Sequence, residues 1–230
     1  MHPEAVCRKV VEHQAQLGIA HDGDADRVLL CDEKGNLIDG DDIMAIAALD
    51  MLAQKTLAEK TLVTTVMSNA GLEAAIKTAG GRVIRTAVGD RNVIDEMLRH
   101  GFNFGGEQSG HLIFRDFGTT GDGLVAALQI LRIVKAKQTP LSKLAKCWTR
   151  FPQLIANVRV REKKPFEQLD GVAQLVGAAG AELKKQGGRV LLRYSGTEPK
   201  ARLLLEGRDA KALEKWSQKI CAAIQKQIGA

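Results

Sequence analysis

Apolar positions along the chain follow two spacings, and the alternation between them predicts the order of its elements. Short runs rich in leucine and β-branched residues are typical of strands, whereas apolar residues three and four apart are typical of helices. Because the two kinds of segment alternate, we expect an α/β chain with mixed sheets covered by helices. Up to residue 150, the pattern predicts strands at 17–20, 28–31, 37–38, 61–65, 82–85 and 102–106, and helices at 2–14, 43–52, 71–79, 93–100, 124–135 and 141–147.

The pattern changes near Phe151 and Pro152, where apolar and polar positions begin to alternate along residues 154–160. This alternation is typical of a strand with one buried face and marks the start of a smaller α+β domain. The rest of that domain is predicted as a helix, strands at 189–193 and 200–206, and a terminal helix at 210–228. We therefore expect three domains, over residues 1–39, 40–150 and 151–230.

Residues 1–39 hold one helix, one strand and a hairpin, which are too few elements for a domain of their own. We interpret them as the C-terminal part of a truncated α/β domain. The unpaired sheet edge of such a part would be apolar, so we expect the isolated chain to associate with other molecules.

Two helix starts can be assigned to capping carboxylates. Asp41 or Asp42 is expected to cap the helix at 43–52, and Asp122 the helix at 124–135. An aspartate side chain at such a position accepts a hydrogen bond from a free N–H group of the first turn.

Composition excludes several classes of protein. With 45% apolar residues in 230, the chain can bury a core, and its net charge of +6 is not gathered into a basic block that would indicate nucleic-acid binding. The richest apolar window, residues 124–134, is too short to span a membrane and is interrupted by Gln129 and Arg132. Four scattered cysteines without a CxxC pair indicate reduced thiols and a cytoplasmic protein.

The clearest chemical motif is Asp22-Gly23-Asp24-Ala25-Asp26-Arg27, which lies between two predicted strands. Three carboxylates at alternate positions of a tight loop can converge on one hard cation such as Mg²⁺ and leave positions for a phosphate oxygen. An EF-hand is an alternative, because Glu33 falls at the twelfth position, but Arg27 stands where that loop needs glycine. A haloacid-dehalogenase-type phosphatase is another, although its nucleophilic aspartate is followed by a different pattern.

Two further polar loops follow predicted strands. The first, residues 106–111, is framed by glycines and carries Glu107, Ser109 and His111; by itself such a loop is often only a solvated turn. The second, residues 193–199, offers two hydroxyl groups and backbone N–H groups around Gly196. Its neighbouring cations Arg193, Lys200 and Arg202 suit a phosphate monoester, although arginines on an edge strand also discourage aggregation.

Together these motifs resemble the C-terminal portion of the α-D-phosphohexomutase family. The acidic loop is similar to the family's metal loop, residues 106–111 to its sugar-binding loop, and residues 193–199 to its phosphate-binding loop. The resemblance extends to residues 88–91 and 119–123 and covers essentially the whole chain. Ala25 and Gln108 favour the branch of the family that acts on glucosamine phosphates.

The resemblance implies a role for each motif. In this family a phosphoserine donates its phosphoryl group to a sugar monophosphate, and the resulting bisphosphate turns over and returns its other phosphate to the serine. Mg²⁺ would be held by Asp22, Asp24 and Asp26, and Arg27 and His111 would support catalysis. Substrate would be bound by Arg91, Glu107, Ser109, His111, Arg193, Ser195, Gly196, Thr197 and Arg202.

The family's nucleophilic serine lies in a serine-histidine-asparagine-proline loop, and no segment of these 230 residues resembles it. We therefore expect the chain alone to have little or no mutase activity. The expected partners are a hexose phosphate, with glucosamine phosphate preferred, and an N-terminal domain or a second copy of the chain. The alternatives are a phosphomannomutase or phosphoglucomutase, or a phosphosugar-binding fragment without catalytic activity.

Overall fold

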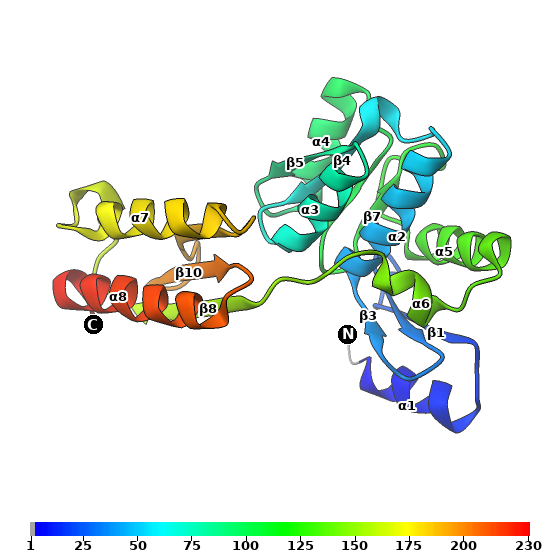
Figure 1. The fold of residues 1–230 in the computed structure, drawn as a ribbon, viewed down its shortest axis with the longest axis horizontal. Helices are drawn as coiled ribbons and strands as arrows, with labels where there is room; N and C mark the ends of the chain where they lie inside the picture. The colour runs from blue at the N-terminus through cyan, green and yellow to red at the C-terminus, as the bar shows by residue number, and fades with distance from the viewer. Residues whose placement is uncertain (1–2) are drawn as a thin grey trace. The chain divides into compact units, whose positions relative to one another are not determined.

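The computed structural model describes residues 3–230 and is mixed α/β throughout (Figure 1). Met1 and His2 lie outside the described residues, and so does the first residue of the helix predicted at 2–14. The chain forms two compact units. Unit 1 contains the residues up to 68 together with 72–149, and unit 2 contains residues 69–71 and 150–230. Residues 1–39 and most of residues 40–150 lie in unit 1, and the division into three domains stays a prediction.

Unit 1 begins with a helix that packs on a three-stranded antiparallel sheet. Helix α1 buries Val10, and the Val10 side chain approaches the sheet at Gly18, where a Cβ atom would lie 2.6 Å from it. Strand β1 pairs only with β2, so it forms an edge of the sheet within the described residues. The expected association through this edge stays a prediction. The elements are α1 (Glu4–Glu12), β1 (Leu17–His21), β2 (Val28–Asp32) and β3 (Leu37–Ile38), in the sheet order β1-β2-β3.

The larger sheet of unit 1 has four strands in the order β5-β4-β6-β7. Strands β5, β4 and β6 are parallel, and β7 is antiparallel to β6. Every residue of β4 is buried; Leu62 belongs to the main hydrophobic core with α2, α3 and α5, and Val63 to a smaller core with α4. The strands are β4 (Thr61–Thr65), β5 (Arg82–Thr86), β6 (Phe104–Gly106) and β7 (Leu112–Phe114). The helices are α2 (Gly40–Ala53), η1 (Ala58–Lys60), α3 (Ala70–Thr78), α4 (Asp90–His100), α5 (Gly123–Lys137), α6 (Leu141–Leu144) and η2 (Ala145–Cys147).

The ends of these elements correct some expectations. The cap of α2 is Asp39, and not Asp41 or Asp42, because the helix begins at Gly40; Asp42 completes a capping box with Asp39. The cap expected at Asp122 is confirmed, since its carboxylate accepts from the Val125 N–H group at 2.9 Å. The helix predicted at 141–147 changes from α to 3-10 geometry after Leu144, and β7 was not predicted because three residues are too few to show a period.

Unit 2 is a three-stranded antiparallel sheet with two helices packed on one face (Figure 1). Ala201 and Leu203 point into the core beneath the helices, so Arg202, which lies between them on the strand, faces the opposite side. The elements are β8 (Gln153–Arg159), η3 (Phe166–Gln168), α7 (Val172–Lys184), β9 (Arg189–Tyr194), β10 (Lys200–Glu206) and α8 (Ala210–Ile228), with the sheet order β8-β10-β9.

Candidate functional site

The acidic loop joins β1 to β2, and the hairpin brings its three carboxylates together. One oxygen from each of Asp22, Asp24 and Asp26 lies within 4.8 Å of the others. Arg27 closes the loop, because its backbone N–H donates to Asp22 Oδ1 at 3.2 Å and its Nε lies 3.6 Å from carboxylate oxygens of Asp22 and Asp26. Ala25 has a φ of 59°, a left-handed conformation that turns the chain between the second and third carboxylates.

The donor set of this loop fits a magnesium ion. Three carboxylates without sulfur or nitrogen ligands suit a hard divalent cation. A bound cation also relieves the mutual repulsion of the three negative charges. The Oδ1 atom of Asp26 is buried and has no hydrogen-bond partner, as expected for an oxygen that binds a metal. Partial burial, together with the hydrogen bond and negative charge of Asp22, raises the pKa of Asp26. Burial also acts on Asp22, but hydrogen bonds from the Arg27 N–H group and from Asp26 outweigh it and lower the pKa of Asp22.

These two shifts predict how the affinity for Mg²⁺ depends on pH. Only ionised carboxylates bind the metal, and a raised pKa means that Asp26 takes up its proton first as the pH falls. We compare the wild-type chain with an Asp26→Asn variant in isothermal titrations with Mg²⁺ between pH 7 and pH 4. As the pH falls, the Mg²⁺ affinity of the wild type should therefore begin to decrease at a higher pH than the Mg²⁺ affinity of the variant. The variant binds more weakly at pH 7 but has no Asp26 proton to take up. Two profiles that fall over the same pH range would contradict this prediction.

The loop of residues 106–111 packs directly on the strand that follows the acidic loop. The Val28 N–H group donates to the carbonyl of Gly110 at 3.0 Å, and Arg27 and His111 form an isolated antiparallel bridge. Gly110 has a φ of +94°, and a Cβ atom there would lie 2.2 Å from the Val28 carbonyl oxygen. Glycine thus allows the backbones of the two loops to approach.

His111 connects the two loops chemically. Its side chain is 7% exposed, and its Nε2 atom lies 3.7 Å from Asp26 Oδ2 and 3.9 Å from Asp90 Oδ2. Its Nδ1 atom is buried and has no hydrogen-bond partner. Gly121 lies against the ring, and a Cβ atom at this position would lie 2.2 Å from Nε2, so only glycine leaves room for the ring here. The sequence indicated His111 and Arg27 but gave no role to Asp90.

Glu107 and Ser109 line a cavity of about 660 Å³ that opens beside Arg27. The position of Glu107 is fixed by the N–H group of Gly89, which donates to its Oε1 atom at 3.0 Å. Sequence reasoning missed most of the lining, since it comes from elements distant in the chain. The other lining residues are Leu29, Leu37, Asp39, Thr65, Met67, Val88 and Gln108.

Arg91 is not brought into this group. Its side chain is 90% exposed, and its Nε atom lies 3.9 Å from Asp95 one helical turn further along α4. A pair this long and exposed holds the arginine only weakly, so its expected contact with the sugar or the phosphate stays a prediction.

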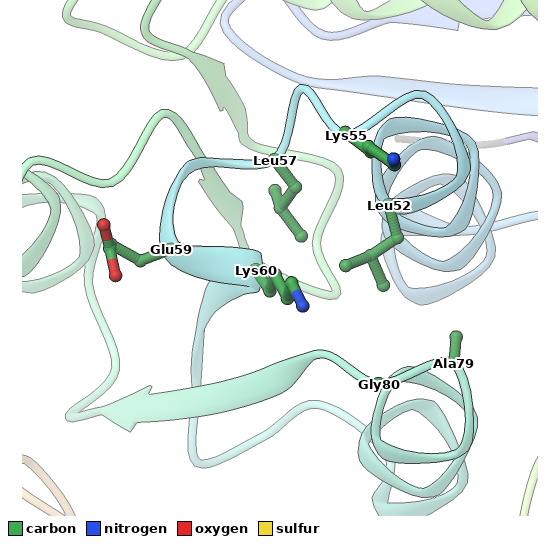
Figure 2. A pocket seen from close by; sticks show the side chains of 7 residues that line it. All are labelled: Leu52, Lys55, Leu57, Glu59, Lys60, Ala79 and Gly80. Atoms are coloured by element: carbon green, nitrogen blue, oxygen red, sulfur yellow. The ribbon is translucent and has the colours of Figure 1, made fainter.

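A second cavity of unit 1, of about 700 Å³, lies at the C-terminal ends of α2 and α3 (Figure 2). Leu52 and Leu57 point into it, whereas Glu59 points away (Figure 2). Lys55 and Lys60 supply the cations of its lining. None of the residues predicted to bind metal, sugar or phosphate lines this cavity.

In unit 2, the predicted phosphate loop connects β9 to β10. The Ser195 N–H group donates to the Lys200 carbonyl at 2.8 Å, which closes the loop at its base. Lys163 Nζ donates to the Ser195 carbonyl at 2.6 Å, and Tyr194 Oη donates to the Lys164 carbonyl at 2.6 Å. The segment of Lys163 and Lys164 thus holds the loop from one side. The sequence gave no role to Lys163, because it lies 32 residues from Ser195.

The cations of this loop share one face of the sheet. Arg202 and Arg193 are directly opposite each other on β10 and β9. Glu198 accepts from Lys200 Nζ at 2.6 Å and from Arg202 Nη2 at 2.8 Å. The hydrogen bond from Lys200, followed by that from Arg202, lowers the pKa of Glu198. Ser195, Gly196 and Thr197 form the turn between these cations, so unit 2 brings together all five residues predicted to bind phosphate.

Comparison with protein families gives two matches in chain order. Residues 39–151 match the phosphoglucomutase/phosphomannomutase alpha/beta/alpha domain III, and residues 155–223 match the phosphoglucomutase/phosphomannomutase C-terminal domain. The first match includes the loop of Glu107 and His111, and the second includes the loop of Ser195. No helix within residues 3–230 has both the length and the apolar content needed to cross a membrane.

Curated relatives match the whole chain but are longer. A phosphoglucosamine mutase of Anaeromyxobacter dehalogenans is 54% identical over 100% of this chain and 50% of its own length. The phosphoglucosamine mutase of Geobacter metallireducens is 53% identical over 100% of this chain and 51% of its own length. The chain thus spans about half the length of these relatives.

Solved structures share the fold at lower identity. Aspergillus fumigatus N-acetylphosphoglucosamine mutase is similar with a TM-score of 0.75 at 22% identity, over 90% of this chain and 48% of that one. A phosphoglucomutase/phosphomannomutase family protein of Burkholderia thailandensis has a TM-score of 0.74 at 23% identity, over 98% of this chain and 50% of that one. A further structure of the Aspergillus enzyme, with a TM-score of 0.71 at 21% identity over 90% of this chain and 48% of that one, is a complex with GlcNAc-6P and magnesium.

Proposed function

Because the chain belongs to the phosphoglucomutase/phosphomannomutase family, we propose that it is the part of a phosphoglucosamine mutase that binds Mg²⁺, the sugar and the phosphate that does not react. The curated relatives at 53% and 54% identity, both phosphoglucosamine mutases, support glucosamine phosphate as the substrate. The reaction would interconvert glucosamine 6-phosphate and glucosamine 1-phosphate through a phosphoserine and a bisphosphate.

The observation that carries the proposal is the contact between the acidic loop and the loop of residues 106–111. His111 lies 3.7 Å from Asp26, and Glu107 and Ser109 line the cavity beside Arg27. This arrangement supports a site in which sugar hydroxyls would be bound beside a divalent cation. Mg²⁺ bound by Asp22, Asp24 and Asp26 would neutralise charge on a transferring phosphoryl group.

The residues of this chain would position the substrate for that transfer. Glu107 is held by the Gly89 N–H group, so its free oxygen can accept a hydrogen bond from a ring hydroxyl. The loop of Ser195 and Thr197 would bind the phosphate that does not react through N–H, hydroxyl and guanidinium donors. Binding energy gained at this remote phosphate would orient the reacting hydroxyl group.

The nucleophilic serine would come from a segment outside these 230 residues. We therefore propose that the purified chain binds the sugar phosphate without turning it over. This separation of binding from turnover distinguishes the proposal from a complete mutase. The relatives, which are about twice as long, support a serine-bearing N-terminal half as the partner.

Calorimetric titration of the purified chain with glucosamine 6-phosphate in the presence of Mg²⁺ tests the proposal. Glucose 6-phosphate and mannose 6-phosphate serve as matched ligands that differ at the amino group or in sugar configuration. We expect saturable binding that favours the amino sugar, and no glucosamine 1-phosphate after prolonged incubation. Preference for one of the other two sugar phosphates would indicate a phosphoglucomutase or phosphomannomutase, and turnover by the chain alone would overturn the proposed division of roles.

A further inference from the structure

Glu198 is the only carboxylate of the phosphate loop, and it contacts two of the loop's cations. Its Oε1 atom lies 2.6 Å from Lys200 Nζ, and its Oε2 atom lies 2.8 Å from Arg202 Nη2. The Glu198 side chain is 42% exposed and the Arg202 side chain 38% exposed, so the pair lies at the surface of unit 2. The carboxylate thus occupies donors that a phosphate oxygen would also use.

The sheet brings positive charges together close to Glu198. Arg193 and Arg202 are paired across β9 and β10, and like charges directly opposite each other destabilise a sheet. Lys200 adds a third positive charge at the start of β10. Glu198 offsets part of this repulsion, and a bound phosphate would offset it as well.

Arg202 is only partly satisfied by Glu198. The Nε and Nη2 groups of an arginine donate along one edge of the guanidinium plane and can bind two oxygens of one anion together. Here Nη2 donates to Glu198, whereas Nε is buried and has no hydrogen-bond partner. Leaving a buried donor without an acceptor is unfavourable, so this edge is better suited to an anion that reaches both groups.

We propose that Glu198 is an internal competitor of the phosphate, which displaces it from Arg202 on binding. This inference rests on the proposed function, because it takes the loop of Ser195 to be a phosphate site. A phosphate carries up to two negative charges and three free oxygens, so it can satisfy both Nε and Nη2 of Arg202. The Glu198 side chain is 42% exposed, so it can turn toward solvent.

The competition has a use in a mutase. The substrate must turn over between its two phosphoryl transfers, so the loop has to release one phosphate and bind the other. A carboxylate within reach of Lys200 and Arg202 replaces the departing anion and shortens the time that a phosphate stays bound. Glu198 thereby sets the affinity of the site below the value that its cations alone would give.

The test compares the full wild-type chain with a Glu198→Gln variant. Glutamine keeps the size of the side chain but removes the charge that competes for Lys200 and Arg202. We expect inorganic phosphate at pH 8 to bind the variant about fivefold more tightly in calorimetric titrations, which corresponds to the modest energy of an exposed ion pair. Glu214→Gln is the matched control, because it makes the same change on the exposed surface of α8, outside the loop and the segment that holds it; the phosphate affinity of this control should stay within about twofold of wild type.

The outcomes separate this inference from the proposed function. If wild type binds phosphate and Glu198→Gln binds it equally or more weakly, Glu198 only positions Arg202, and the competition is excluded while the phosphate site stands. If neither the wild type nor Glu198→Gln binds phosphate, both the phosphate site and the competition are excluded. Should Glu198→Gln fail to fold by circular dichroism, Glu198→Asp provides the test, since its shorter carboxylate reaches Arg202 less well and should also tighten phosphate binding.

Discussion

An Asp24→Asn variant is expected to bind Mg²⁺ at least about 100-fold more weakly than the wild-type chain. Loss of a residue that only supports a metal ligand typically reduces affinity by about 10- to 100-fold, so the loss of a ligand should cost no less. Asp24 is the most direct of the three positions to test. Within residues 3–230 its carboxylate forms no hydrogen bond and no ion pair, so the substitution removes no contact of the fold. Isothermal titration with MgCl₂ gives the affinity.

The thermal stability of the Asp24→Asn variant provides a second readout, in which the substitution is expected to increase a measured value rather than decrease it. Three carboxylates with oxygens within 4.8 Å repel one another, so removing one charge should raise the melting temperature of the metal-free chain. Mg²⁺ should then stabilise the variant much less than the wild type. Asp95→Asn is the control, because it makes the same change on the exposed surface of α4 and should leave Mg²⁺ affinity unaltered. Equal affinity in wild type and Asp24→Asn would exclude this loop as the metal site.

The acidic loop is the part of the site that could be predicted most fully from sequence. Its three carboxylates lie within five residues, and a hairpin between β1 and β2 is enough to bring them together. The expected strand, loop, strand order is confirmed, because hydrophobic runs on both sides of the loop fix it locally. For the same reason, the turn between β2 and β3 was also predicted correctly.

The environment of His111 could not be predicted in the same way. Asp90 begins α4 and Asp26 follows β1, and both lie near His111 because β7 turns back antiparallel to β6 and the loop before it packs on β2. That pairing depends on a three-residue strand with no visible period. The N–H of Gly89 that holds Glu107, and the ammonium group of Lys163 that holds Ser195, likewise come from distant segments. The candidate loops could therefore be recognised from sequence motifs. The residues that position them could not, because they come from segments that only the tertiary fold brings close.

A Gly110→Ala variant is expected to destabilise unit 1 by about 3 to 4 kcal/mol. A methyl group at Gly110 would lie 2.2 Å from the Val28 carbonyl oxygen, and the backbone φ of +94° is itself unfavourable for alanine. Relief would require the loop of residues 106–111 to move away from β2. The hydrogen bond from the Val28 N–H group to the Gly110 carbonyl and the bridge between Arg27 and His111 would then be lost. Urea denaturation followed by circular dichroism measures the change in the free energy of unfolding.

Gly101→Ala separates the steric clash from the backbone strain. Gly101 also has a positive φ, +76°, but a Cβ atom there would meet nothing within 4 Å. Its substitution should therefore cost only about 1 kcal/mol, the price of a left-handed alanine. The difference between the two variants in the free energy of unfolding measures what the contact between the loop of residues 106–111 and β2 contributes to stability. If both substitutions cost the same, the loop can leave β2 without penalty, and His111 would not depend on that contact to stay beside Asp26.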